Sequence, residues 1–378
     1  MVSRFVDLAR RSALLVPVGA GVALARAAWD VPLAVGGRPT GERLARMLRS
    51  PNFADGAFQN PVAATMMPPS SGPGVLREMV LGKEKRRPTH PVPLVAPSAA
   101  ELSAPPLDGL RLTWFGHATV LAEVEGRRVL FDPVWSERVS PSAVLGPKRL
   151  HPMPMALGDL PPVDAVVISH DHYDHLDMAT VRRLAAHSPR ARFVVPLGVG
   201  AHLERWRIPP GRIDELDWNE SADVDGITLT ATTARHFSGR LRPGGNGTLW
   251  ASWVVAGAHR KVFYTGDSGY FDGYADIGAA HGPFDVTLVQ VGAYSPYWPD
   301  IHMTPEEGVA THLAVGGELL VPVHWCTFNL AIHAWDEPVE RLLADAAAHD
   351  VRVAVPRPGE LLDVAAPARP TGWWRTVA

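Results

Sequence analysis

The feature that most constrains this chain is the run at residues 170–175, which reads His-Asp-His-Tyr-Asp-His. It follows Ser169 and an apolar run at 165–168, which predicts a buried strand. A buried polar group without a partner costs about 1–3 kcal/mol. Three imidazoles and two carboxylates within six residues therefore indicate that something binds them. Alternation along an extended chain would put His170 and His172 on one side, and Asp174 and His175 would turn toward a neighbouring position. The run therefore predicts ligands for two adjacent cations, and such donors suit zinc, iron or manganese.

Further candidate ligands stand where predicted strands end. His236, Asp267 and His324 each follow an apolar run later in the chain. A single His after a strand is more often a structural residue than a ligand. Here, however, strand ends meet at one edge of a sheet, and the order of a cluster, then a His, an Asp and a His favours ligands. The candidate metal ligands are therefore His170, His172, Asp174, His175, His236, Asp267 and His324.

Three other side chains are candidates for substrate contact. His117 lies in a turn between two predicted strands, where it could orient a ligand, contact substrate or simply bond to backbone. His302 precedes Thr304, the expected N-cap of a helix, and a helix N-terminus beside an imidazole favours an anion. Tyr294 could line the pocket, although a Tyr near a site is as often packing.

Composition narrows the function classes. Apolar residues make up 46% of the 378 and charged residues 20%, as in folded globular proteins. A net charge of −3 argues against a nucleic-acid partner. Cys326 is the only cysteine, so any metal must be held by His and carboxylates rather than by a Cys-rich cluster.

Strand patterns dominate first and then alternate with helical ones, which favours two packed sheets with helices outside. Strands are expected at 110–115, 120–124, 128–131, 165–168, 193–196, 227–231, 250–255, 261–264, 286–290 and 319–323. Helices are expected at 178–187, 304–315 and 336–349. In the second of these helices, Thr304 and Glu307 predict a capping box, and Gly316 predicts the stop.

The chain divides by composition into three parts. Residues 1–50 hold an apolar run at 13–25 behind Arg10 and Arg11, too short for the ~20 residues of a spanning helix. This run predicts a membrane-associating helix, with an export signal as the alternative. Residues 51–106 are Pro-rich and predict an extended strap, whose basic cluster at 83–87 could meet anionic lipid or be a solvated turn. Residues 107–378 form the expected hydrolase domain.

Several stretches together resemble the metallo-β-lactamase fold superfamily from about residue 110 to 362. More narrowly, the chain resembles the phospholipase D that hydrolyses N-acylphosphatidylethanolamine and its bacterial relatives. The stretches that carry this resemblance are 114–119, 131–133, 146–149, 169–177, 265–270, 292–294, 302–307 and 324–328, with 50–53 and 59–61 in the strap.

The resemblance implies a four-layer αβ/βα sandwich, an α/β fold with an N-terminal extension here, and a dinuclear site that usually holds two Zn²⁺. On this chain, the first metal would take His170, His172 and His236, and the second would take Asp174, His175 and His324, with Asp267 bridging. This donor set leaves room for a bridging hydroxide. The catalytic residues implied are Asp174, Asp267 and His302, the last near the substrate phosphate.

We therefore expect a metal-dependent hydrolase, and within that class a phosphodiesterase acting on phospholipid-like substrates. A lactonase or other carboxylic-ester hydrolase remains open because the same nucleophile attacks a carbonyl. An iron-loaded redox protein or a non-catalytic metal-binding protein is the alternative from another class. We expect peripheral membrane association on the cytoplasmic side, with export as the alternative, and the sequence predicts no oligomeric state.

Overall fold

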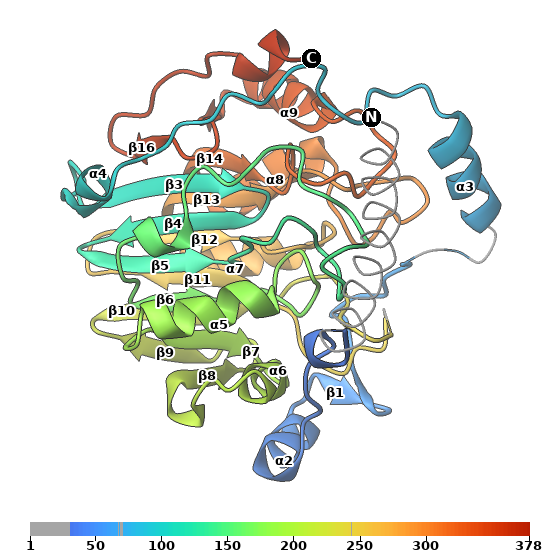
Figure 1. The fold of residues 1–378 in the computed structure, drawn as a ribbon, viewed down its shortest axis with the longest axis vertical. Helices are drawn as coiled ribbons and strands as arrows, with labels where there is room; N and C mark the ends of the chain where they lie inside the picture. The colour runs from blue at the N-terminus through green and yellow to red at the C-terminus, as the bar shows by residue number, and fades with distance from the viewer. Residues whose placement is uncertain (1–30, 67, 69–70, 243) are drawn as a thin grey trace, which may run out of the picture.

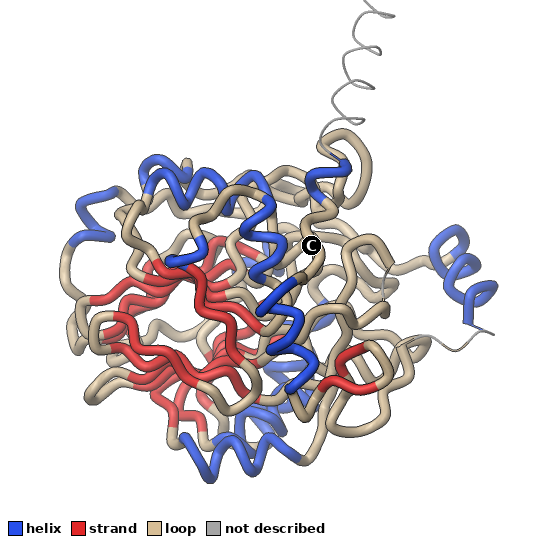
Figure 2. Tube along the Cα trace, turned by 90° about the horizontal axis from the view of Figure 1, so that it is seen from below, coloured by secondary structure: helices blue, strands red, loops and turns tan. Residues whose placement is uncertain are grey.

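Two seven-stranded sheets pack face to face, and helices cover their outer faces (Figure 1). The computed structural model describes residues 31–66, 68, 71–242 and 244–378. Viewed from below, the strands lie in the middle, with helices on both outer sides (Figure 2). The predicted α/β class and four-layer αβ/βα arrangement are confirmed.

The first sheet is built mainly from the earlier part of the domain and has the order β16-β3-β4-β5-β6-β7-β8. Strands β3 to β5 are antiparallel, and β5 to β8 are parallel. The bounds are β3 (Leu110–Gly116), β4 (Thr119–Val124), β5 (Arg127–Phe131), β6 (Ala165–Val167), β7 (Arg192–Pro196), β8 (Ile213–Leu216) and β16 (Leu361–Asp363).

The second sheet repeats this plan, in the order β15-β14-β13-β12-β11-β10-β9. Strands β9 to β12 are antiparallel, and β12 to β15 are parallel. The bounds are β9 (Ser221–Val224), β10 (Ile227–Thr232), β11 (Ser252–Ala256), β12 (Lys261–Tyr264), β13 (Phe284–Gln290), β14 (Gly317–Val323) and β15 (Arg352–Val353).

Helices α5 to α9 provide the crossovers between parallel strands except the one from β5 to β6. The bounds are α2 (Gly41–Arg49), α3 (Ser71–Leu81), α4 (Ala99–Ser103), α5 (Met178–His187), α6 (Gly200–Arg205), α7 (Gly273–His281), α8 (Pro305–Val315) and α9 (Glu337–Ala348), with short 3₁₀ turns at Leu157–Asp159, Pro210–Arg212 and Trp373–Thr376. The predicted capping box of α8 is present, and Gly316 ends this helix in the left-handed conformation.

The core lies between the two sheets because their facing side chains are almost all apolar. The C-terminal end of the chain closes this core through aromatic stacking. Trp325, which follows β14, stacks between Trp114 of β3 and Trp373, with ring centroids 5.7 and 5.6 Å away. The edge strands β8, β9, β15 and β16 are short, and the apolar patterns of the sequence did not predict them.

The Pro-rich segment is only partly the extended strap that we expected. It contains the two-stranded hairpin of β1 (Phe53–Ala54) and β2 (Ala57–Phe58) and the helices α3 and α4. The expectation of extended chain is wrong for Ser71–Leu81, because Pro73 lies in the first helical turn, where its missing N–H has no intrahelical partner to lose. The apolar run at 13–25 lies outside the described residues. None of the helices in the described part of the chain has the length and apolarity needed to cross a bilayer.

Candidate metal centre

The predicted ligands collect at the edge where β6, β10, β12 and β14 end. The run at 170–175 follows β6 and ends in a tight turn, since the N–H groups of His175 and Leu176 both donate to the carbonyl of His172, at 3.1 and 2.8 Å. As the predicted alternation requires, His170 and His172 lie on one side, and the carboxylate of Asp171 between them points away. The turn then carries Asp174 and His175 toward a neighbouring position, also as predicted.

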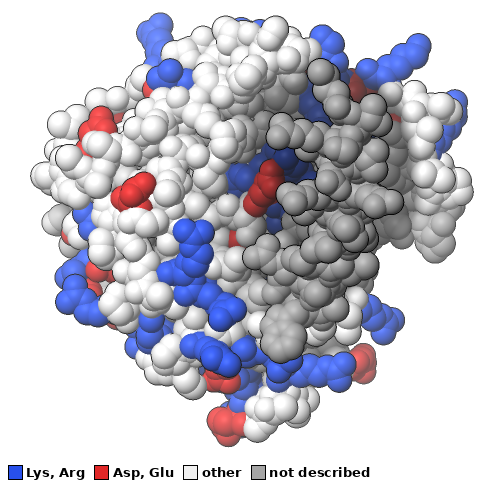
Figure 3. Space-filling model, viewed as in Figure 1, with Lys and Arg blue, Asp and Glu red and all other residues white. Residues whose placement is uncertain are grey.

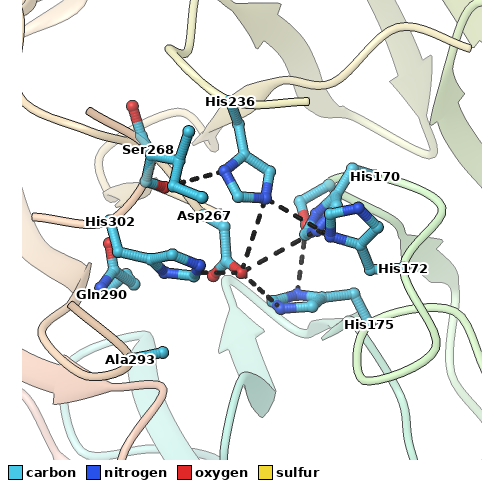
Figure 4. A network of polar contacts seen from close by, with 12 residues as sticks. His170, His172, His175, His236, Asp267, Ser268, Gln290, Ala293 and His302 are labelled. Carbon is cyan, nitrogen blue, oxygen red and sulfur yellow. Dashed lines mark hydrogen bonds and ion pairs between the residues drawn. The ribbon is translucent and has the colours of Figure 1, made fainter. Parts of the chain in front are cut away.

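Three imidazoles form one group of donors. His170 Nε2 lies 2.8 Å from His172 Nδ1, and His236 Nε2 lies 3.4 Å from that same atom. The three nitrogens converge at the upper right of Figure 4, although His236 comes from a different sheet. This group contains the residues predicted to hold the first metal.

A second group gathers around Asp174. Its Oδ2 lies 3.5 Å from His175 Nε2, 3.4 Å from His324 Nε2 and 2.9 Å from His117 Nε2. His117 therefore joins the residues predicted to hold the second metal and touches their carboxylate directly. The backbone supports this placement, because the His324 N–H donates to the His117 carbonyl at 2.8 Å.

Asp267 lies between the two groups. Its Oδ2 is 3.0 Å from His175 Nε2 and 3.1 Å from His324 Nε2, and 3.9 Å from both His170 Nε2 and His236 Nε2. One carboxylate oxygen thus faces four imidazoles from both donor groups, as Figure 4 shows for three of them. This is the position that a bridging ligand would need.

The unsatisfied atoms of the site test whether a metal fits. Within the described part of the chain, three buried imidazole nitrogens that lie 3.0, 3.1 and 4.0 Å from Asp267 Oδ2 make no hydrogen bond: His175 Nε2, His324 Nε2 and His302 Nδ1. Orphaned buried donors and acceptors are rare in folded proteins. Imidazole nitrogens and carboxylate oxygens are also the atoms that bind zinc or iron. The residues therefore fit a metal centre.

The charge states suit the same purpose. Burial and neighbouring imidazoles hold the pKa values of His170 and His236 well below the ordinary value, which keeps both side chains neutral. Burial opposes ionisation of Asp267, but His175 and His324 outweigh it and hold the carboxyl pKa well below its usual range. Burial would also lower the pKa of His175, yet the adjacent carboxylates raise it well above normal. The carboxylates therefore stabilise positive charge at this place, which a bound cation would supply.

Asp132, for which the sequence predicted no role, lies directly behind His175. The fully buried carboxylate accepts a hydrogen bond from His175 Nδ1 at 2.7 Å and bonds from the backbone N–H and hydroxyl of Ser169 at 2.7 and 2.5 Å. It fixes the orientation of His175, whose Nε2 then faces the centre. The signal in the sequence was a carboxylate directly after a strand and before Pro133.

Two more supporting residues were also missed. The carboxylate of Asp171 turns away from the ligands, accepting from Gly239 N–H at 2.8 Å and lying 3.3 Å from His202 Nε2. Asn60, in the strap, bonds to the backbone of His236. Both lie in stretches that the sequence singled out, but their partners lie far away in the sequence, so no local pattern showed their roles.

The candidate substrate residues occupy different positions. His302 faces the centre, with Nδ1 4.0 Å from Asp267 Oδ2 (Figure 4). His117 is buried against the second donor group, as described above. The Tyr294 hydroxyl instead donates to Glu337 Oε1 at 2.5 Å, and its ring stacks on His333. Substrate contact by these three residues stays a prediction.

Comparison with known proteins gives the relationships of the chain. The family model of the beta-lactamase superfamily domain matches residues 127–325. An uncharacterized protein of Mycobacterium tuberculosis is 50% identical over 380 residues, covering 99% of this chain and 100% of the relative. The N-acyl-phosphatidylethanolamine-hydrolyzing phospholipase D 1 of Caenorhabditis elegans is 39% identical over 236 residues, 59% of this chain and 65% of that enzyme.

Solved structures share the fold. Igni18, a metallo hydrolase from the archaeon Ignicoccus hospitalis, superimposes with a TM-score of 0.53 at 24% identity, over 67% of this chain and 97% of that one. The family match spans the strands that end at the metal centre, and the donor set fits a metal. The chain therefore belongs to the beta-lactamase superfamily domain family, as a metal-dependent hydrolase of the metallo-β-lactamase fold.

Proposed function

We propose that this hydrolase is a dinuclear phosphodiesterase of phospholipase D type, acting on N-acylphosphatidylethanolamine-like phospholipids. The position of Asp267 carries the proposal, because its Oδ2 lies within 4 Å of imidazoles from both donor groups. A pair of cations about 3.5–4 Å apart clamps the attacking and leaving oxygens of an in-line phosphoryl displacement. We propose two zinc ions, since His and Asp are ordinary zinc ligands.

The residues of the chain would divide the work. His170, His172 and His236 would hold one ion, and Asp174, His175 and His324 would hold the other, with Asp267 shared. Bound divalent cations would supply a nucleophile from water at neutral pH and stabilise negative charge on the phosphoryl oxygens. His302 would bind a phosphate oxygen, because its ring faces the centre from the segment that precedes the N-terminus of α8.

The substrate class is supported by the relative from C. elegans, whose name states hydrolysis of N-acyl-phosphatidylethanolamine. The matched region covers only part of either chain, so the proposal depends on a direct assay. A phospholipid substrate also implies that the protein works at a membrane, and we propose peripheral association, on the cytoplasmic side, for this reason.

The test is turnover of defined lipid by metal-loaded protein. We expect phosphatidate and N-acylethanolamine as products by mass spectrometry, loss of both on chelation, and loss of both in His324→Ala. His349→Ala, which changes an exposed imidazole on the outer surface, should keep wild-type turnover. Hydrolysis of lactones or carboxylic esters, with none of the phospholipid, would overturn the proposal in favour of an esterase on the same centre.

A further inference from the structure

Helix α3 carries apolar side chains on its solvent-facing side. Leu76 and Val80 are 63% and 70% exposed, and Met79 between them is 49% exposed. The helix stands apart from the two sheets at the right of both ribbon views (Figures 1 and 2). A helix at the surface of a globular protein normally turns such an i, i+3, i+4 stripe toward the core.

The opposite side of α3 is the one that contacts the body. Gly74 lies against Tyr297, since a Cβ atom on this glycine would come within 2.7 Å of the Tyr297 ring. At 100° per residue, Leu76, Met79 and Val80 all lie more than a right angle away from Gly74 around the helix. The side of α3 that carries Gly74 therefore packs against the body of the protein, and the apolar stripe faces solvent.

A basic segment follows α3 at once. Lys83, Lys85 and Arg87 are all exposed, and Glu84 is the single acidic residue among residues 83–87. Blue side chains border the uncoloured surface at the right-hand edge of the space-filling view (Figure 3). The segment is tied to the body, because the Trp335 N–H donates to the Lys85 carbonyl at 2.9 Å. Helix α3 and residues 83–87 thus form one protruding surface with apolar and cationic side chains.

This protruding surface lies close to the candidate metal centre. Arg86, within the basic segment, lines a cavity together with His117 and His324. The segment of Tyr297 also holds His302, five residues further along the chain. A surface that contacted α3 would consequently lie near the candidate active site.

We propose that α3 and residues 83–87 form a docking surface for a bilayer that contains anionic lipids. The apolar stripe of Leu76, Met79 and Val80 enters the interface between headgroups and acyl chains, and the Lys and Arg side chains bind the anionic headgroups. This goes beyond the proposed function, because it states which surface meets the membrane and requires no particular substrate.

Charge favours a lipid surface over a second copy of the chain. Two copies that met at α3 would bring two sets of Lys83, Lys85 and Arg87 together, and like charges repel. An anionic bilayer offers the complementary charge and an apolar interior at the same place. Basic residues next to an apolar helix face are the usual composition of interfacial helices.

Flotation of the full metal-loaded chain with vesicles tests the proposal. We expect binding to equimolar phosphatidylcholine and phosphatidylglycerol, and weaker binding to phosphatidylcholine alone. The variant Leu76→Ser with Val80→Ser should lower the partition coefficient about tenfold or more. Lys83→Gln with Lys85→Gln and Arg87→Gln should remove most of the difference between the two kinds of vesicle.

The matched control replaces two exposed leucines elsewhere, Leu48→Ser with Leu107→Ser, which are 61% and 77% exposed on other parts of the surface. This control should bind as the wild type does. Equal binding by the Leu76/Val80 variant would overturn the proposal, as would a monomer for that variant and a dimer for the wild type in the absence of lipid. Because flotation needs no turnover, failure of the proposed phospholipase activity leaves this test intact.

Discussion

The side-chain amide of Asn60 makes two hydrogen bonds to the backbone of His236, 176 residues away in the sequence. Its Nδ2 donates to the His236 carbonyl at 2.7 Å, and its Oδ1 accepts from the His236 N–H at 2.9 Å. The imidazole of His236 donates from Nδ1 to the Ile301 carbonyl at 2.8 Å, and this bond turns its Nε2 toward the other candidate ligands. A residue of the strap thus holds the backbone of a candidate metal ligand in place.

Asn60→Ala should weaken metal binding without unfolding the chain. Removal of both hydrogen bonds frees the backbone that positions His236, and changes behind a metal ligand typically cost about 10–100-fold in affinity. Competition with a chromophoric chelator measures this. Gln59→Ala is the control, because the neighbouring amide bonds only within the hairpin, to the carbonyls of Ala54 and Ala57. Equal affinity in the two variants would contradict a positioning role for Asn60.

Asp132→Asn should also lower metal affinity, by about 10–100-fold. An amide has only one acceptor oxygen, so it cannot accept from the Ser169 N–H and from His175 Nδ1 as the two carboxylate oxygens do. The imidazole therefore loses its fixed orientation or its negative partner. Asp225→Asn, in an exposed turn between β9 and β10, should leave the affinity unchanged. Titration of the metal-free variants gives the comparison, and unchanged affinity in Asp132→Asn would be the contrary outcome.

Removal of metal should destabilise the whole fold. A ligand at a hundred times its Kd adds about 2.7 kcal/mol to the free energy of unfolding. Chelation should therefore lower the Tm of the wild type, and Asp267→Ala, which removes the carboxylate between the donor groups, should lose most of this shift. Differential scanning calorimetry with and without chelator tests the point. A chelator-dependent shift of full size in Asp267→Ala would speak against the shared role of this residue.

His302→Gln separates substrate binding from metal binding. If His302 contacts the phosphate, kcat/KM should fall about 10²–10³-fold, as when one oxyanion donor is removed. The metal content by mass spectrometry should stay at the wild-type value. A loss of bound metal would instead make His302 a ligand, which its 4.0 Å distance from Asp267 also permits.

Trp373→Ala should cost about 3–5 kcal/mol in the free energy of unfolding. The indole is 5% exposed, stacks on Trp325 and donates to the Val355 carbonyl. Urea denaturation followed by circular dichroism measures the loss. Arg375→Ala, on the exposed side of the same short helix, should change stability by less than about 1 kcal/mol.

The sequence by itself determined the class of fold and the donor set. Apolar runs of strand length, the capping box at Thr304 and Glu307, and the density of ligands at residues 170–175 are local patterns, and physical chemistry acts on them locally. The helix at Met178–His187 and the strand at Lys261–Tyr264 accordingly have the bounds that we predicted. Resemblance to a known family then indicated which donors belong together.

Only the tertiary structure decided how those donors are supported, where the short edge strands form and which side of α3 faces solvent. Asp132 and Asn60 act through partners that the chain brings close only after the sheets have formed, so the sequence does not show which ligands they support. The short edge strands depend on neighbours for their hydrogen bonds rather than on their own propensity. Helix α3 is outward-facing because Gly74 meets Tyr297, a contact between residues far apart in the chain.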